Sequence, residues 1–445
     1  MSIYPSGSVV AANYADDQMG NPFAEAMPDV LSPNYFIKHI ASLPAMPHDL
    51  QAFSLEERRR HLSLLSSLFL PLPYMYTIYD SLYRAIATTY TTRMALDEIR
   101  QINALFGGRA EMNYAVQADS GSILGVPGIG KSSTVHRCLS IMPQVIEHTE
   151  YRGQPFYCKQ ILYLQVECPS DCSVKTLAFN ILLALDRVIG SRYLDNLTSI
   201  RSSSASAIAT QIKILCMTHH VGLLLIDEIQ NAVVTANRNH QVRPLIKFLV
   251  ELTNDTCTAI YFIGTPLAEE LFISQEHLKR RTRGVRLLPL KPDGTYRTFL
   301  EKLWQYQFTP QITPLTDKFA NKLYDWSGGI PAYIVKIFQE TQAQSLLMGS
   351  GCISESIMQR AIDILSIKVP RTYSSGTYIS DFELGEPSPV PVSGSENGPK
   401  LYANKRGRKA AVRDKADLLV AYRTGQDVLP HLTAHGLLEE REPPC

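Results

Sequence analysis

The sequence contains no apolar run close to the roughly 20 residues that a membrane-spanning helix needs. Its start, Met1-Ser2-Ile3-Tyr4-Pro5, lacks the charged and apolar regions of a secretory signal peptide. An excess of one charge is also lacking, since 43 Lys and Arg residues stand against 42 Asp and Glu residues. We therefore expect a cytoplasmic protein with no membrane partner, in which any contact with nucleic acid depends on local basic patches.

Cysteine is scarce, with 8 residues in 445, and without a secretory signal these thiols are expected to be reduced. Cys168 and Cys172 are close in the sequence, but no second Cys/His pair at ligand spacing follows, which argues against a zinc site. Apolar content of 45% and charged content of 19% are ordinary for a globular chain. The length allows two or three domains.

One glycine-rich stretch fits the phosphate-binding pattern GxxxxGK[ST] at every fixed position. Bare backbone lets N–H groups approach a triphosphate, Lys131 is expected to reach the β- and γ-phosphates, and Ser132 is expected to bind Mg²⁺. A predicted strand precedes the stretch and a predicted helix follows it, which disfavours a chance match in a glycine-rich turn. The expected nucleotide-binding residues are Gly125, Val126, Pro127, Gly128, Ile129, Gly130, Lys131, Ser132 and Ser133.

Two carboxylates, Asp227 and Glu228, follow the apolar run Leu223-Leu224-Leu225-Ile226, which predicts a buried parallel strand. Ligands bind at the carboxyl ends of strands in open α/β sheets. We therefore expect Asp227 to hold Mg²⁺ through water and Glu228 to act as the general base on the water that attacks the γ-phosphate. Thr265 ends a third predicted strand and is the candidate γ-phosphate sensor, with an ordinary turn residue as the alternative.

Two basic stretches have competing interpretations. The first, from Glu276 to Arg286, is predicted to supply an arginine that reaches the γ-phosphate of a neighbouring subunit. Either Arg280 or Arg281 fits that role, and a DNA-facing loop is the competing interpretation. The second, Arg58-Arg59-Arg60, is either a DNA phosphate contact or the solvated face of a helix.

Composition and periodicity divide the chain into five predicted segments. They are residues 1–114, an N-terminal arm and helical region; 115–289, an α/β nucleotide-binding core with a parallel sheet; 290–370, a helical lid; 371–413, a flexible basic linker; and 414–445, a short helical tail that binds a partner. The first 45 residues show no clear period, so they are expected to form either a loosely ordered arm or an irregularly packed segment. A tail that folds back on the body is the alternative for the last segment.

The order of these motifs is that of AAA+ P-loop ATPases, and within that class the chain resembles TnsC-type (TniB-related) transposition regulators. The resemblance rests on Leu225-Ile226-Asp227-Glu228-Ile229-Gln230-Asn231, Phe262-Ile263-Gly264-Thr265-Pro266, Leu278-Lys279-Arg280-Arg281, Pro71-Leu72-Pro73, Thr91-Thr92-Arg93, Ala421-Tyr422-Arg423-Thr424-Gly425 and Ala434-His435-Gly436-Leu437-Leu438.

This resemblance implies an ATP- and Mg²⁺-dependent ring or helical oligomer on double-stranded DNA, which links a target-selector protein to transposase subunits. In the family, the loops after the second strand and after its helix face the DNA, which points here to Lys175 and Arg192. Many lids carry an arginine that touches the nucleotide. Ala332 stands at that position here, so this function is absent or supplied elsewhere.

An AAA+ DNA-replication initiator or helicase loader is the alternative function. Such a protein should carry a winged-helix domain after the lid, whereas a Pro/Ser-rich linker and a short tail stand there. A third hypothesis is a non-enzymatic scaffold gated by a nucleoside triphosphate. Glu228 argues against it, because a pure switch need not keep a catalytic base.

Overall fold

The computed structural model describes residues 4, 7–15, 20–93, 118, 120–198, 204–236, 242–269, 271 and 282–367. All of these residues belong to Met1–Gly385, the first of two units into which the chain divides. Among the helices described, none has the length and apolar character that crossing a membrane requires. The predicted finger residues Arg280 and Arg281, the linker and the C-terminal tail lie outside the described residues.

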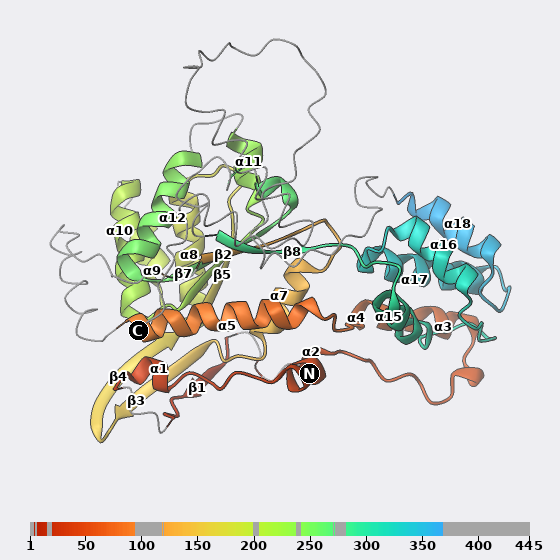
Figure 1. Cartoon of the computed structure of the whole chain (residues 1–445), viewed down its shortest axis with the longest axis horizontal. Coiled ribbons are helices and arrows are strands. Elements are labelled where there is room, and N and C mark those ends of the chain that lie inside the picture. Colours follow the sequence, from red (N-terminus) through yellow and green to blue (C-terminus); the bar gives the residue numbers. More distant parts are fainter. Residues whose placement is uncertain are drawn as a thin grey trace, which may run out of the picture. The chain divides into compact units, whose positions relative to one another are not determined.

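A five-stranded sheet forms the centre of the α/β core (Figure 1). Its strands are β2 (Ser120–Gly125), β5 (Tyr163–Glu167), β6 (Leu223–Asp227), β7 (Ala259–Gly264) and β8 (Thr282–Leu287). They lie in the order β5-β6-β7-β2-β8, and every neighbouring pair is parallel. Strands β2, β6 and β7 are buried along their whole length, as expected for apolar runs covered on both faces. The predicted α/β class with a parallel sheet is confirmed.

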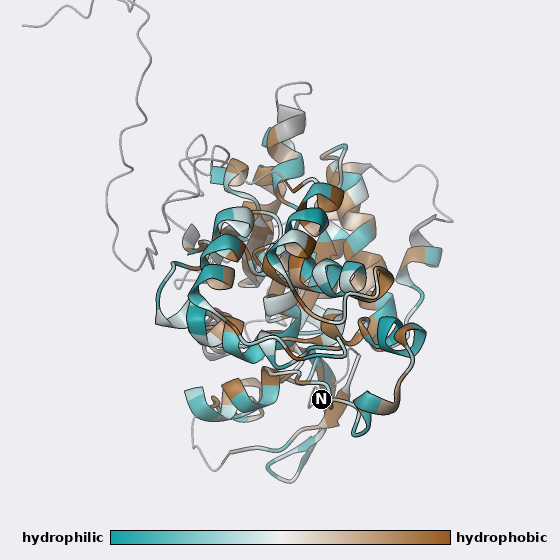
Figure 2. Cartoon of the chain, turned by 90° about the vertical axis from the view of Figure 1, so that its right-hand side faces the viewer, coloured by the Kyte–Doolittle hydropathy of each residue, from teal (hydrophilic) through white to brown (hydrophobic). Residues whose placement is uncertain are grey.

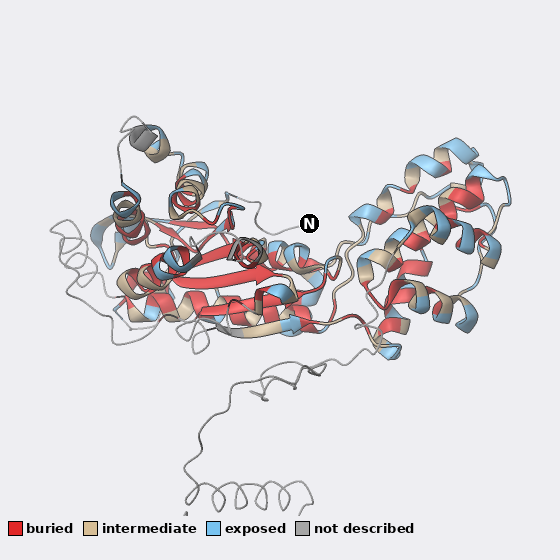
Figure 3. Ribbon diagram, turned by 90° about the horizontal axis from the view of Figure 1, so that it is seen from above, coloured by how far each residue is buried: buried red, intermediate tan, exposed pale blue. Residues whose placement is uncertain are grey.

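Helices cover both faces of this sheet, and the strands are buried between them (Figure 3). The covering helices are α5 (Tyr74–Thr92), α7 (Lys131–Leu139), α8 (Val174–Ile189), α10 (Ala205–Thr218) and α12 (Val242–Thr256). Ile226 and Phe262 belong to the apolar cluster formed with α8, α10 and α12. Leu225 and Ile263, each one residue away in the strand, belong to the cluster formed with α5 and α7. This alternation places one layer of helices on each face.

The described N-terminal residues form short elements that pack irregularly beside a second sheet, which is the second of the two predicted alternatives and not a loosely ordered arm. Strand β1 (Val9–Ala11) pairs in parallel with β3 (Val145–Tyr151), which pairs antiparallel with β4 (Gln154–Ile161). Phe23 in α1 (Pro22–Glu25) and Phe36 in α2 (Pro33–Ile40) are fully buried. The elements are too short to show a period in the sequence, and their stability comes from these contacts.

A helical lid follows the sheet, as predicted. Its helices are α15 (Gly294–Trp304), α16 (Asp317–Ser327), α17 (Pro331–Leu347) and α18 (Glu355–Leu365). The side chains of Asp293, Thr316 and Ser354 accept hydrogen bonds at the starts of α15, α16 and α18, and Pro331 begins α17. Figure 2 shows hydrophilic residues on the outward faces of these helices and apolar residues on the faces toward the interior.

Two N-terminal helical predictions are corrected in their bounds. In the sequence, the capping-box signature of Ser54 and Glu57 predicts one helix through Phe69. The capping box is present, but the helix is divided into α3 (Leu55–His61) and α4 (Leu64–Ser67). The next pattern predicts a helix from about Met75 to Leu105 with a possible break near Thr91. The structure has α5 ending at Thr92, and residues 94–117 lie outside the described chain. The remaining short elements are η1 (Leu50–Ala52), α9 (Tyr193–Thr198), α11 (Gln230–Ala236) and η2 (Pro266–Ala268).

Candidate nucleotide site

The glycine-rich loop makes a tight turn between β2 and α7. Gly128 and Gly130 have φ angles of 82° and 97°, a region that residues with side chains rarely adopt. A Cβ atom on Gly125 would stand 2.9 Å from the side chain of Ile129. Helix α7 begins at Lys131, so its first N–H groups lie at the end of the loop. The loop is therefore a bare-backbone cradle of the kind that fits phosphate.

The side chains of the loop divide between the core and the solvent. Val126 and Ile129 are buried, at 3% and 1% exposure, so only their backbones can face a ligand. Pro127, Ser132 and Ser133 are exposed. The structure thus gathers the predicted nucleotide-binding residues in one loop, and their individual contacts with nucleotide stay predictions.

Lys131 is folded back onto the loop. Its Nζ donates hydrogen bonds to the carbonyl oxygens of Gly125 at 2.8 Å and Val126 at 3.3 Å. Burial lowers the pKa of this ammonium, and the nearby carboxylates of Glu228 and Asp227 oppose that shift. A bound phosphate would compensate the buried charge better than neutral carbonyl groups do.

Ser132 and Asp227, the two candidate ligands of Mg²⁺, are in direct contact. The Ser132 hydroxyl donates to Asp227 Oδ2 at 2.9 Å, while Asp227 Oδ1 accepts from the Glu228 amide at 2.8 Å. Hydroxyl and carboxylate oxygens suit this hard cation. Within the part of the chain that the structure describes, no group of three or more His, Cys, Asp or Glu side chains could hold a metal. Mg²⁺ here would take its other ligands from phosphate and water, and it would neutralise phosphate charge.

Glu228 and Thr265 are joined through a third residue, Gln230. The Gln230 Nε2 donates to Glu228 Oε2, and the Gln230 Oε1 accepts from the Thr265 amide at 3.0 Å. Glu228 has a φ angle of 56°, an unusual conformation that is costly unless its surroundings enforce it. In the sequence analysis, Gln230 appears only within the stretch Leu225–Asn231, and no role is predicted for it. The available signal was an amide side chain two residues after the candidate base.

The start of the lid helix α17 contacts the phosphate-binding loop. The Ala332 amide donates to the Gly128 carbonyl oxygen at 3.2 Å. A Cβ on Gly128 would stand 3.1 Å from Ile330 and 3.4 Å from Ala332. On the opposite side, the Tyr74 hydroxyl donates to the Ile129 carbonyl oxygen at 3.3 Å. Ala332, which stands where many lids carry an arginine, therefore contacts the loop through its own backbone amide.

Lys175 and Arg192, the candidate DNA contacts, are exposed but are not brought together. Lys175 lies in the first turn of α8, where its Nζ stands 5.7 Å from the centre of the Phe179 ring. Arg192 lies just beyond the other end of the same helix. At 1.5 Å per residue, the two backbones are about 25 Å apart. At this separation the two side chains could contact only different phosphates of a DNA duplex. Both remain predicted DNA contacts.

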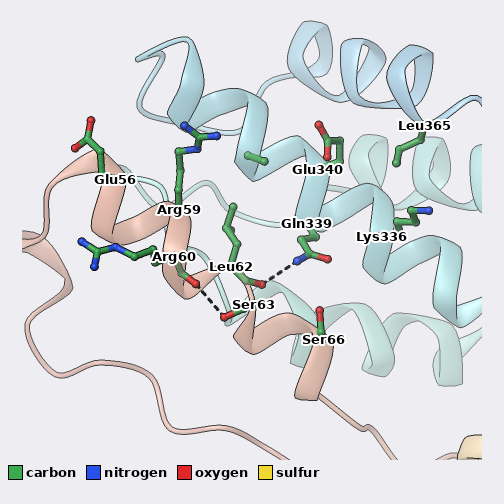
Figure 4. Close-up of a pocket in the computed structure, with 11 residues that line it drawn as sticks. Glu56, Arg59, Arg60, Leu62, Ser63, Ser66, Lys336, Gln339, Glu340 and Leu365 are labelled. Carbon is green, nitrogen blue, oxygen red and sulfur yellow. Dashed lines mark hydrogen bonds between the residues drawn. The ribbon is translucent and has the colours of Figure 1, made fainter.

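A second pocket, of about 750 Å³, shares no lining residue with the phosphate-binding loop (Figure 4). It lies between α3–α4 and α17, where the Gln339 side chain donates to the Leu62 carbonyl oxygen at 3.0 Å. Exposed Arg59 and Arg60 line it, whereas Arg58 is buried and donates to the Phe308 carbonyl oxygen. Within the basic run, Arg58 therefore has a structural role, and Arg59 and Arg60 belong to a solvated helix face.

The comparison with protein-family models identifies an AAA domain in the part of the chain that contains the glycine-rich loop. Residues 115–272 match a family model described as an AAA domain. Among solved structures, the chain is similar to the Aeropyrum pernix ORC1 protein in complex with DNA, at 11% identity and a TM-score of 0.41, over 75% of this chain and 68% of that one. Drosophila ORC bound to DNA is similar at 13% identity and a TM-score of 0.42, over 95% of this chain and 86% of that one.

The Thermotoga maritima RuvB Holliday junction branch migration motor gives 13% identity and a TM-score of 0.33, over 62% of this chain and 72% of that one. These identities and TM-scores are too low to transfer any function. No curated protein matches the chain. The residues matched by the AAA model include Lys131, Ser132 and Asp227, whose side chains make the contacts described above.

Proposed function

We propose that the AAA domain of this chain binds Mg²⁺-ATP and hydrolyses it to ADP and phosphate. The observation that carries this proposal is the single hydrogen-bonded chain from Ser132 through Asp227, Glu228 and Gln230 to Thr265. It joins the loop that would hold the phosphates to the carboxylate that would activate water. Residues from three strand ends meet there, at the edge where parallel sheets bind ligands.

Each residue has a role that follows from its chemistry. Lys131 and the N-terminus of α7 bind the phosphates, and Ser132 and Asp227 hold Mg²⁺. Glu228 accepts a proton from the attacking water, and Thr265 contacts the γ-phosphate. Arg280 or Arg281 of a neighbouring subunit is proposed to stabilise the charge that develops on the transferred phosphoryl group.

We further propose that the chain assembles on double-stranded DNA as a transposition regulator between a target-selector protein and transposase. The support for this part is the resemblance of the stretches Leu225–Asn231 and Phe262–Pro266 to TnsC-type proteins. Ala332 at the lid position gives a physical reason for assembly. With no arginine at this position, a neighbour's guanidinium would have to supply the missing positive charge.

An electrophoretic mobility-shift assay tests the DNA part. The protein should retard a DNA duplex in ATP or a non-hydrolysable analogue, but not without nucleotide. Lys175→Glu and Arg192→Glu should weaken this shift and make it less sensitive to salt, because each removes a phosphate contact. Lys302→Glu, at an exposed site on α15, is the matched control. Equal binding of the parent protein with and without nucleotide would refute the proposal.

A pull-down with purified partners tests the transposition part. Deletion of residues 414–445 should preserve ATP binding and abolish capture of transposase, because the tail is the proposed partner-binding segment. Capture that survives the deletion removes this role of the tail. Capture of a replicative helicase in place of transposase would replace the regulator with the initiator or helicase-loader alternative.

A further inference from the structure

Gln230 bridges two groups that come from different strand ends of the central sheet. It is the first residue of α11 and follows the end of β6 by three positions. Its side-chain Nε2 donates to the carboxylate of Glu228. Its Oε1 accepts from the backbone amide of Thr265, just beyond β7, at 3.0 Å. One side chain therefore ties the candidate base to the candidate phosphate sensor.

The carboxamide of Gln230 matches the hydrogen-bonding needs of both partners. A backbone N–H can only donate and an ionised carboxylate can only accept, so the bridging group needs an acceptor at one end and a donor at the other. These partners also fix the orientation of the amide, with Oε1 toward Thr265. A glutamate at position 230 would place two carboxylates face to face, and a leucine would offer neither function.

The surroundings leave this bridge little freedom. A Cβ on Gly264 would stand 2.5 Å from the Gln230 Oε1 and 2.8 Å from the Ile229 side chain, so the glycine is needed for the amide to fit. The Ile229 amide donates to the Ile263 carbonyl oxygen at 3.1 Å, which fixes the same turn to β7 through the main chain. The Glu228 backbone, at a φ of 56°, is held in its unusual conformation by this turn.

We propose that Gln230 is a positioning residue for ATP hydrolysis. It acts through Glu228, whose carboxylate it holds at a fixed place relative to Thr265. When a γ-phosphate displaces the Thr265 backbone, the amide bridge moves the carboxylate with it, so the base takes its working position in response to the bound substrate. This inference rests on the proposed ATPase function and adds a residue to it.

Steady-state kinetics of Gln230→Leu test the inference. We expect kcat to fall about 10- to 100-fold, because misplacement of a general base by about 1 Å costs up to that much. The KM for ATP and the Kd for ATPγS should change less than about twofold, since no phosphate ligand is touched. Gln359→Leu is the matched control. Gln359 donates an amide–carboxylate hydrogen bond of 3.0 Å to Asp363 on the exposed face of α18, and its loss should leave kcat unchanged.

Two further measurements separate positioning from a structural effect. Glu228→Gln and the double variant Glu228→Gln/Gln230→Leu should have the same kcat, because a residue that acts through Glu228 has no effect once the base is gone. ADP with aluminium fluoride, a mimic of the transferring phosphoryl group, should be retained less well by Gln230→Leu, although ATPγS binds normally. Gln230→Asn keeps an amide one methylene shorter, and it replaces the leucine variant if that variant fails to fold.

The outcomes are distinguishable. A kcat of Gln230→Leu equal to or above that of the parent, or multiplicative losses in the double variant, would overturn the inference while leaving the ATPase function intact. A parent protein that binds duplex DNA with nucleotide but never hydrolyses ATP would remove both the proposed enzymatic function and the role of Gln230.

Discussion

The hydroxyl of Ser132 lies 2.9 Å from the carboxylate Oδ2 of Asp227, although 95 residues separate them in the sequence. One residue stands at the start of α7 and the other at the end of β6. The contact means that the fold alone assembles two oxygen ligands for a divalent cation. Binding of Mg²⁺ therefore needs little rearrangement of the protein, which lowers its entropic cost.

Lys131→Ala should weaken ATP binding by about 10- to 100-fold, because a charge-assisted hydrogen bond to phosphate contributes about 1.5–3 kcal/mol. Titration with a fluorescent ATP analogue measures the change. Lys247→Ala removes a lysine whose side chain is 79% exposed on α12 and should bind as the parent does. If Lys131→Ala bound nucleotide as tightly as the parent protein, the whole nucleotide site would have to be abandoned.

Glu228→Gln should trap the ATP-bound assembly. The amide keeps the size of the side chain but cannot accept the proton of the attacking water, so hydrolysis should fall at least about 100-fold. Size-exclusion chromatography with ATP should show a stable oligomer of the variant. Glu56→Gln, on the exposed face of α3, should behave like the parent. A variant that stays monomeric in ATP would count against nucleotide-driven assembly.

Arg93→Leu should lower the free energy of unfolding by about 3 kcal/mol, since it strands buried acceptors. Arg93 is fully buried, and it donates to the Thr256 carbonyl oxygen at 2.8 Å and to the Thr258 hydroxyl at 2.7 Å. Urea unfolding measures the loss. Arg84→Leu is the control, because Arg84 lies in α5 and Arg93 is the residue that follows the last turn of that helix. Its guanidinium, 51% exposed, pairs with Asp80 and should contribute under about 1 kcal/mol. Equal losses in both variants would contradict the assigned role.

The stability of the protein should fall as the pH drops from 6.5 toward 4. Burial lowers the pKa of His219 to about 4, so the folded ring stays neutral where an unfolded histidine takes up a proton. The unfolded state then binds more protons, and stability present above pH 6.5 is lost as the pH falls to about 4, by on the order of 2 kcal/mol.

Thermal unfolding at several pH values between 6.5 and 4 measures how steeply the stability depends on pH. Burial lowers the pKa of His148 as well, so its effect adds in the same direction. His219→Gln should make the stability of the protein depend less steeply on pH, whatever its effect on stability at neutral pH. His48→Gln, at an exposed site, should leave the pH dependence unchanged. An unchanged slope in the His219 variant would exclude this ring as a source.

The motifs that the sequence predicted are those whose function depends on residues close together along the chain. The glycine spacing from Gly125 to Ser132 and the acids after Ile226 could be assigned without knowing their neighbours. The lid helices were predicted for the same reason, because the helical spacing of apolar residues after Leu290 is a local pattern.

Features that depend on distant partners could not be predicted. Phe23 is fully buried among distant aromatic residues, and the centre of its ring lies 4.0 Å from that of His220. No periodic pattern in the sequence predicts such a pair. The hairpin of β3 and β4 was not predicted. The apolar run from Ile161 to Val166 predicts a single strand, whereas in the structure β4 ends at Ile161 and β5 begins at Tyr163. Gln230 gained a role only when the fold brought Thr265 to it.

The contact between Ala332 and Gly128 makes the first turn of α17 continuous with the surface that would grip the phosphates. This helix has 17 residues, so it is about 25 Å long. Halfway along α17, the Gln339 side chain donates to the carbonyl oxygen of Leu62 at 3.0 Å. One rigid helix therefore connects the glycine-rich loop to the N-terminal helices, so any change at the loop that tilted α17 would also strain this second contact.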